Sequence, residues 1–207
     1  MAVLYHWSFL NPSYLEPRGC TLLNPEPLVI LVDENDQQIG TMPKQEAHEK
    51  ALRHRAFSVF IYRKSQQDIE ILLQQRHKDK YHCGGLWTNT CCSHPYPNED
   101  IITAGERRLY EEMGIKTSLK EIGVFHYIAE FANGLTENEI DHVLVGELQQ
   151  AHFTVNAQEV MNHQWVSLPT LLDELKQRPH KYTPWLLPAV EIMFNNFAFF
   201  KDHKQDQ

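Results

Sequence analysis

The chain of 207 residues is long enough to bury its own core without disulfides, and its hydrophobic fraction of 42% is that of an ordinary globular protein. The formal net charge of -8 disfavours nucleic acids and anionic membranes as partners, and no run approaches the roughly 18 apolar residues of a membrane span. Two of the four cysteines are adjacent and the first residues lack a signal-peptide pattern, so we expect a cytoplasmic protein. Its composition leaves both a monomer and a homodimer open.

Taken in chain order, residues 1–24 carry little periodicity, and we expect them to form an extension ahead of one domain over residues 25–207. Runs of β-branched and aromatic residues then predict strands at 27–33, 55–62, 70–76, 124–131, 140–148 and 162–168. The polar stretch 132–139 between two of these strands predicts a hairpin loop.

Three helices are predicted among these strands. The first begins at a cap, Asp100 or Asn98, and ends at Gly114, where a glycine suits the left-handed backbone of a helix end. Two more follow at about 169–177 and 184–200, the last opened by Thr183. A mixture of non-local strands and helices of this kind predicts an α+β fold in which helices sandwich a central sheet.

The helix after Asp100 carries a spaced motif. Ser93 is followed after five residues by Glu99, and after seven more by the run that begins at Arg107, RRLYEEMGI. This pattern resembles the Nudix box, a glycine, five residues, a glutamate, seven residues and then R-E-U-x-E-E-x-G-U, with U a bulky apolar residue. Ser93 replaces the first glycine, and Arg108 replaces a glutamate.

The chemistry of this helix follows from its spacing. Arg108 and Glu112 lie four residues apart and so share one helix face. The guanidinium can bind a diphosphate directly, while the carboxylate can reach the same diphosphate through Mg²⁺, which prefers oxygen ligands. The plain alternative is a solvated helix with Arg107–Glu111 and Arg108–Glu112 ion pairs.

The segments around the box resemble a narrower family, the type I isopentenyl-diphosphate isomerases. The likeness covers roughly residues 27–195 and is carried by HRAFSVFIY, LLQQRHKDK, GGLWTNTCCSHP and TENE. It implies a Nudix-type α/β/α sandwich with a mixed central sheet. It also implies a metal-dependent enzyme that converts isopentenyl diphosphate to dimethylallyl diphosphate.

The resemblance further implies roles for individual residues. Cys92, Glu139, Tyr127 and Trp185 fall on the catalytic positions, and Cys91 falls beside the catalytic cysteine without taking part. One divalent transition metal, Mn²⁺ or Zn²⁺, would be held by His48, His54, His94, Glu137 and Glu139. Glu112 would bind Mg²⁺, and the diphosphate would be held by Lys44, Arg76, Lys80 and Arg108.

The donor chemistry agrees with a metal site of this kind. Imidazoles and carboxylates together suit Mn²⁺ or Zn²⁺, and five donors favour a six-coordinate ion with one open or shared position. A structural zinc on Cys83, Cys91, Cys92 and His94 is the alternative. The remaining histidines are expected to be ordinary core or surface residues, namely His82, His126, His142 and His163.

The expected chemistry is proton addition and removal on opposite faces of an alkene. Glu139 with Tyr127 would donate the proton, and Cys92, placed in a loop just before a helix, would act as a thiolate base. The π face of Trp185 would stabilise the developing cation. Two other functions stay open: a Nudix diphosphate hydrolase, which Arg108 disfavours, and a non-catalytic metal-stabilised binding module.

Overall fold

The computed structural model describes residues 26–65, 68–150 and 152–202. The expected N-terminal extension over residues 1–24 lies outside the described residues. None of the described helices is long and apolar enough to cross a lipid bilayer.

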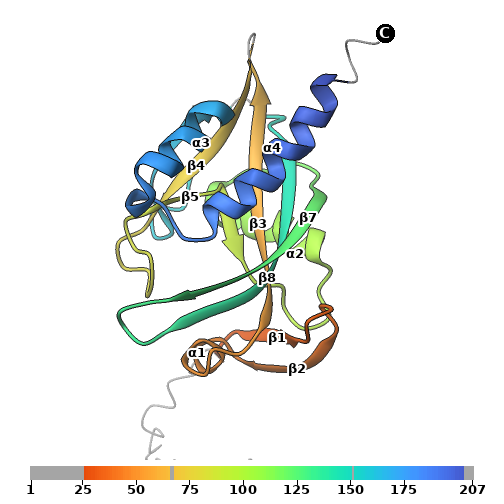
Figure 1. Ribbon diagram of the computed structural model, residues 1–207, viewed down its shortest axis with the longest axis vertical. Coiled ribbons are helices and arrows are strands. Elements are labelled where there is room, and N and C mark those ends of the chain that lie inside the picture. Colours follow the sequence, from red (N-terminus) through yellow and green to blue (C-terminus); the bar gives the residue numbers. More distant parts are fainter. Residues whose placement is uncertain (1–25, 66–67, 151, 203–207) are drawn as a thin grey trace, which may run out of the picture.

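The elements run in a β-rich order, with one short helix near the start and longer helices in the middle and at the end (Figure 1). The strands are β1 (Leu28–Val32), β2 (Gln38–Pro43), β3 (His54–Lys64), β4 (Ile69–Arg76), β5 (Trp87–Thr88), β6 (Cys91–Ser93), β7 (Lys120–Glu130), β8 (Thr136–Glu147) and β9 (Val160–Ser167). The helices are α1 (Lys44–Glu49), α2 (Ile101–Met113), α3 (Leu168–Gln177), the short 3₁₀ helix η1 (Pro179–Lys181) and α4 (Leu186–Asp202).

Strand β3 is the centre of the sheet. It pairs with β1, β4 and β6 in antiparallel fashion and with β8 in parallel fashion, and β7 and β9 add to β8 and β4. The sheet is therefore mixed, as expected. Because helices cover both of its faces, β3 reads as a nearly continuous apolar run rather than as an alternating one.

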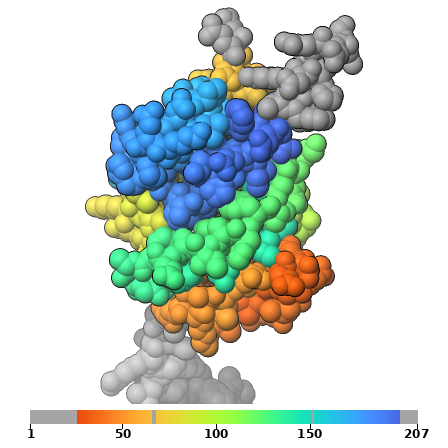
Figure 2. Space-filling view, viewed as in Figure 1, coloured from red at the N-terminus to blue at the C-terminus, as the bar shows by residue number. Residues whose placement is uncertain are grey.

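The two faces of the sheet support two hydrophobic cores. Successive side chains of a strand point to opposite faces, so Phe60 packs among residues of α3 and α4 while Val59 and Ile61 pack beneath α2. Full burial of each such side chain contributes about 1.5–3 kcal/mol. Figure 2 shows α3 and α4 (blue) lying beside the β7–β8 hairpin (green).

Helix α2 is held close to the sheet by its ends and by a glycine. The Asp100 carboxylate accepts hydrogen bonds from the backbone N–H groups of Ile102 and Thr103, so Asp100 rather than Asn98 is the cap. The helix ends at Gly114, whose φ of 66° is left-handed. A Cβ at Gly105 would lie 2.6 Å from Leu144 Cδ1, which shows how closely the helix approaches β8.

Several predicted boundaries were wrong, and the start of β7, at Lys120 rather than at residue 124, is one of them. The expected hairpin loop at 132–139 is shorter, because β8 begins at Thr136 and pairs with β7 from its first residue. The last helix begins at Leu186 rather than at residue 184. The backbone N–H of Thr183 donates to Trp87 O at 3.0 Å, which holds the preceding segment against β5.

Candidate active site

Strand β8 presents three carboxylates on one face. Glu137, Glu139 and Asp141 are two residues apart and all are buried, as expected for one side of a strand. In the sheet, Glu139 is aligned with His54 of β3 on one side and with Tyr127 of β7 on the other. The register of three strands thus brings the acidic residues together with their predicted partners.

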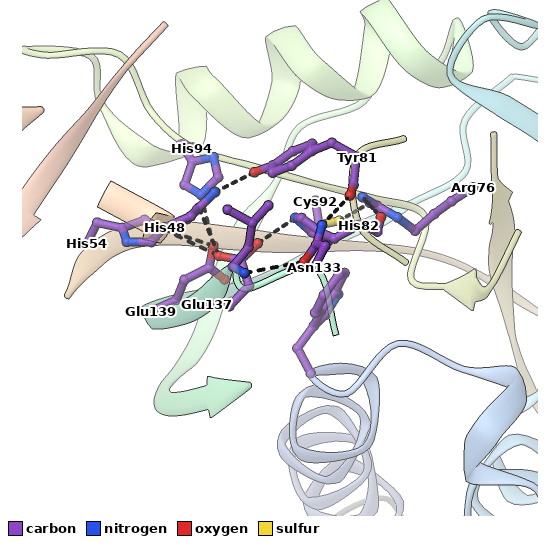
Figure 3. A network of polar contacts seen from close by, with 12 residues as sticks. His48, His54, Arg76, Tyr81, His82, Cys92, His94, Asn133, Glu137 and Glu139 are labelled. Atoms are coloured by element: carbon purple, nitrogen blue, oxygen red, sulfur yellow. Dashed lines mark hydrogen bonds and ion pairs between the residues drawn. The ribbon is translucent and has the colours of Figure 1, made fainter. Parts of the chain in front are cut away.

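The five predicted transition-metal ligands converge beside these strands (Figure 3). His48, His54, His94, Glu137 and Glu139 each offer one donor atom within 4.8 Å of the others. Three of these separations are His48 Nε2–His54 Nε2, His48 Nε2–Glu137 Oε2 and His94 Nε2–Glu139 Oε1, at 3.2, 3.0 and 2.8 Å. With metal–ligand bonds of about 2.1 Å, neighbouring donors of a six-coordinate ion lie about 3 Å apart. The described residues therefore fit the ion that the donor set suggests.

Hydrogen bonds outside the cluster orient two of the histidines. The Nδ1 atom of His54 lies 2.8 Å from Leu52 O and donates its proton to that carbonyl, which leaves Nε2 directed at the cluster. Tyr81 OH lies 2.5 Å from His48 Nδ1 on the far side of that ring. Such outer bonds fix the tautomer and the ring plane of a metal ligand.

The two ionised carboxylates of the cluster favour the binding of a cation between them. Burial lowers the pKa of His54, but the adjacent Glu137 and Glu139 carboxylates outweigh it and raise this pKa to about 10. Burial lowers the pKa of His94 to about 4. Burial opposes ionisation of both carboxylates, yet the surrounding imidazoles keep the pKa of Glu137 well below its ordinary value and lower that of Glu139. Without a metal, a proton on His54 supplies the positive charge between them.

The adjacent cysteines of β6 face opposite ways. Cys91 is fully buried in the core beneath α2, whereas Cys92 lines the pocket and its Sγ accepts a hydrogen bond of 3.5 Å from Arg76. Burial raises the pKa of the Cys92 thiol to about 12, against the opposing charge of Arg76. Cys92 thus lies on a short strand rather than in the expected loop, and its burial favours the neutral thiol over the expected thiolate.

The other predicted catalytic residues also line the pocket. Tyr127 OH donates to Glu139 Oε2 at 2.5 Å. Trp185 Nε1 donates to Thr88 Oγ1 and Asn89 Oδ1, both at 3.1 Å, which fixes the indole plane. The Trp185 ring lies 6.1 Å from the Tyr127 ring between centroids, so an aromatic wall stands beside the Glu139–Tyr127 pair.

The four predicted basic residues all line the pocket. Lys44, Lys80 and Arg108 line both this pocket and the cavity next to it, while Arg76 lines the first. The guanidinium of Arg108 pairs with Glu112, whose other oxygen accepts a hydrogen bond of 2.9 Å from Gln74. This arrangement places a guanidinium that can bind an anion directly beside a carboxylate that can bind a cation.

Helix α2 also contains the ion pairs of the plain alternative. Arg107 contacts Glu111 at 3.4 Å and binds both oxygens of Glu99, at 2.7 and 2.8 Å. Arg107 and Glu99 therefore brace the start of the helix, whereas Arg108 and Glu112 face the pocket.

The structure disfavours the alternative zinc site on cysteines. Within the described residues, the group of potential metal ligands contains no cysteine, and Cys91 lies in the core on the other side of β6 from Cys92. A zinc on Cys83, Cys91, Cys92 and His94 would need both of these thiols on one side.

Sequence reasoning missed several pocket residues. His82 was expected to be an ordinary histidine, but it lines the pocket, and its Nε2 lies 2.6 Å from Glu137 Oε1. Tyr81 and Asp141 also line the pocket. Asp141 could have been predicted, because residues two apart on a strand share a face and Asp141 follows Glu139 by two. His82 and Tyr81 come from a loop that has no periodic pattern to reveal them. Of the other histidines, His126 lies at the surface and bonds to Asn138.

Comparison with known proteins gives the site its context. The family model described as the NUDIX domain matches residues 52–186. The chain is 47% identical over 166 residues to the isopentenyl-diphosphate Delta-isomerase of Aliivibrio fischeri, covering 78% of this chain and 91% of that protein. It is 44% identical to the enzyme of the same name from Pectobacterium atrosepticum, with 76% and 86% covered.

Solved structures agree with the fold. A protein of Deinococcus radiodurans superimposes with a TM-score of 0.64 at 17% identity, covering 79% of this chain and 97% of that one. A MutT protein of Methanosarcina mazei superimposes with a TM-score of 0.55 at 18% identity, covering 70% and 95%. At these identities the likeness concerns the fold alone, and it confirms the predicted α+β Nudix architecture.

Proposed function

This chain belongs to the isopentenyl-diphosphate isomerase family of Nudix proteins and converts isopentenyl diphosphate to dimethylallyl diphosphate, and we propose that Cys92 and the Glu139–Tyr127 pair move the protons. The observation that carries this assignment is their common pocket, in which the thiol and the hydrogen-bonded pair stand beside a cluster of five potential metal ligands. Two separate proton-transfer groups are what a double-bond shift requires.

The reaction adds a proton at one end of the alkene and removes another from the far side of the tertiary carbon. Glu139 with Tyr127 donates the first proton, and Cys92 accepts the second. Because burial raises the pKa of the Cys92 thiol, Cys92 can act as this base only after its own proton has passed to solvent water, before the substrate fills the pocket. Arg76 is positioned to stabilise the resulting thiolate, since its guanidinium lies 3.5 Å from Sγ.

The cluster of potential metal ligands affects how readily the Glu139–Tyr127 pair donates its proton. We propose that His48, His54, His94, Glu137 and Glu139 hold Mn²⁺ or Zn²⁺, because the donors are nitrogens and carboxylate oxygens without a thiolate. When bound, such an ion supplies positive charge that makes a proton shared by Glu139 and Tyr127 easier to donate. Glu139 is suited to this role because one of its oxygens faces the cluster and the other faces Tyr127.

The hydrocarbon end of the substrate fits the aromatic side of the pocket. Trp185 is almost fully buried and its indole is held by two hydrogen bonds, so its π face is fixed. A desolvated cation–π contact is worth about 2 kcal/mol or more. An apolar wall also keeps water away from a cation that water would convert to an alcohol.

The diphosphate end fits the basic side. Arg108 and Lys80 would contact phosphate oxygens together with Lys44 and Arg76, and Glu112 would bind Mg²⁺ shared with the diphosphate. Anchoring a charged group remote from the alkene gives binding energy that can orient the reacting carbons. Arg108 stands where the general box has a glutamate, which removes a carboxylate that a hydrolase would use to bind metal.

One experiment separates the candidate functions. The purified protein is incubated with isopentenyl diphosphate, Mg²⁺ and Mn²⁺, and the product is followed by NMR together with a phosphate assay. We expect the methyl signals of dimethylallyl diphosphate and no phosphate. Phosphate release would favour the hydrolase, and a folded protein that binds metal without any turnover would favour the binding module.

Two further parts of the proposal concern the whole chain. We propose that residues 25–207 form one catalytic domain, because the described strands join a single sheet. We also propose a cytoplasmic setting. The described cysteines Cys83, Cys91 and Cys92 are all free thiols, which suits a reducing compartment.

A further inference from the structure

The two carboxylates of the metal cluster share a feature: each divides its oxygens between two partners. Glu139 directs Oε1 at His94 and gives Oε2 to Tyr127. Glu137 directs Oε2 at His48 and gives Oε1 to His82, at 3.0 and 2.6 Å respectively. His82 thus stands to Glu137 as Tyr127 stands to Glu139, although His82 is not one of the five cluster residues.

The His82 side chain is held firmly in this position. Its ring stacks on Phe131 with centroids 5.0 Å apart and an interplanar angle of 6°, and it meets the Trp185 ring edge-on at 6.0 Å. Only 9% of the residue is exposed. These two ring contacts leave the imidazole little freedom to turn away from Glu137.

The backbone around His82 links the basic and the metal-binding sides of the pocket. The carbonyl of His82 accepts a hydrogen bond of 3.3 Å from Arg76, and the carbonyl of Tyr81 accepts one of 3.0 Å from Asn133 in the β7–β8 hairpin. The loop between β4 and β5 is therefore fastened at both residues independently of their side chains. The His82 imidazole is the part of this loop that contacts a carboxylate of the cluster.

We propose that His82 is a positioning residue that holds Glu137 as a one-oxygen metal ligand, an inference that rests on the proposed metal site. Its bond to Oε1 keeps that oxygen out of the coordination sphere and keeps Oε2 aimed at the ion. Without it, the carboxylate could rotate or bind through both oxygens and take up the position left open in a six-coordinate site. Loss of such an outer partner typically costs about 10–100-fold in metal affinity or activity.

Three substitutions separate the hydrogen bond from simple packing. His82→Gln places an amide N–H group near the position of Nε2 and can still donate to Glu137. His82→Asn carries the same amide on a shorter side chain that does not reach Oε1, and His82→Leu removes the donor. Because Arg76 bonds to the backbone of residue 82, the diphosphate contacts are unchanged in all three, so kcat should change more than KM.

The test measures Mn²⁺ affinity by electron paramagnetic resonance and kcat and KM at saturating Mn²⁺, with thermal unfolding of the metal-free proteins to compare their folds. We expect His82→Leu and His82→Asn to bind Mn²⁺ about 10–100-fold more weakly and His82→Gln to stay near the wild type. Wild-type Mn²⁺ affinity in the Leu variant, or equal losses in the Gln and Asn variants, would overturn the role of His82. A wild-type protein that binds no Mn²⁺ would instead overturn the proposed metal site.

Discussion

Adjacent residues on a strand point to opposite faces, and in β6 this alternation separates two chemically identical side chains. Cys91 packs under α2 with no exposed surface, while Cys92 faces the pocket and contacts Arg76. The sequence places both cysteines next to the box, but its composition does not indicate which of the two side chains faces the pocket. The choice of Cys92 came from the family resemblance, and the orientation of β6 agrees with it.

Replacing each cysteine in turn tests that orientation. Cys92→Ala should lower kcat by at least about 10²-fold, because general acid–base groups typically contribute 10²–10⁴-fold. Cys91→Ala should retain most activity and lose only about 1 kcal/mol of stability from the small cavity. Isomerisation followed by NMR and urea denaturation of both variants provide the measurement. An inactive Cys91→Ala with an active Cys92→Ala would show that the catalytic thiol is the core one.

Glu112 should serve the diphosphate and leave the transition metal undisturbed. It contacts Arg108 and Gln74 and is not part of the five-residue cluster. Glu112→Gln is therefore expected to raise KM for isopentenyl diphosphate and to weaken its dependence on Mg²⁺. Metal analysis should find the same amount of bound Mn²⁺ as in the wild type. Loss of Mn²⁺ from this variant would contradict the separation of the two sites.

Arg108 distinguishes this chain from the general Nudix box. Arg108→Glu restores the general pattern, yet we expect it to lose isomerase activity and to gain no hydrolysis. Losing a charge-assisted bond to the diphosphate costs about 1.5–3 kcal/mol, or roughly 10–150-fold, and the new negative charge beside Glu111, Glu112 and Glu159 adds repulsion.

The control for this change is Arg108→Lys, which keeps the positive charge but loses the planar fork. It should retain more activity than Arg108→Glu in the same assay. Phosphate release and alkene isomerisation are measured on one preparation of each variant. Robust phosphate release by Arg108→Glu would mean that the box determines the reaction and that the flanking residues do not.

At the scale of elements, apolar patterns predicted the long strands and the core helices, because burial on one or both faces leaves a clear periodicity. The start of β8 was less predictable. Glu137 and Glu139 belong to a polar run, TENE, that resembles a loop, and only pairing with β7 shows that they lie on a strand. A functional strand that buries carboxylates toward a metal site departs from the pattern of an ordinary core strand.

The end of α2 gives a prediction at this scale. Gly114 and Gly134 both have left-handed φ, at 66° and 84°. A Cβ at Gly114 would lie 2.5 Å from Thr154 O, whereas a Cβ at Gly134 would meet nothing within 4 Å. Gly134→Ala should therefore cost only the backbone strain of about 1–2 kcal/mol, and Gly114→Ala should cost clearly more.

Chemical denaturation of the two glycine variants measures this difference in the free energy of unfolding. Gly134 is the matched control, because it shares the backbone conformation and lacks the steric contact. Equal losses of stability in both would show that the contact with Thr154 relaxes freely and that α2 is not held there.

At the scale of the whole molecule, the arrangement of layers followed from the order of elements, and the ligand set followed from family resemblance. His82 and Tyr81 could not be found in either way. They lie in a turn-rich segment that has no periodic pattern, and only the folded structure shows that they line the pocket. The sheet register aligns His54, Glu139 and Tyr127 across three strands, and such alignment is a property of the folded chain.

The buried cluster of potential metal ligands should make the free energy of unfolding of the metal-free protein depend on pH. Bound metal should remove part of this dependence. In the metal-free protein the pKa of His54 is about 10, above its ordinary value near 6.5. The folded state then holds a proton that the unfolded state releases, so the stability from His54 is complete below pH 6.5 and is lost as pH rises toward 10. His94 acts in the opposite sense. Its pKa of about 4 means that stability is lost as pH falls from 6.5 to 4.

We therefore expect the free energy of unfolding of the chelator-treated protein to be greatest near neutral pH and to fall on both sides. Bound metal replaces the proton on His54, so the alkaline fall should disappear in protein saturated with Mn²⁺, and Mn²⁺ binding at pH 7 should release a proton. Urea denaturation from pH 5 to 9.5 with and without Mn²⁺, together with calorimetry in buffers of different ionisation enthalpy, measures both effects. His126→Gln, at an exposed position outside the cluster, is the control and should follow the wild type. A metal-free protein as stable at pH 9.5 as at pH 7 would show that His54 does not carry the charge between Glu137 and Glu139.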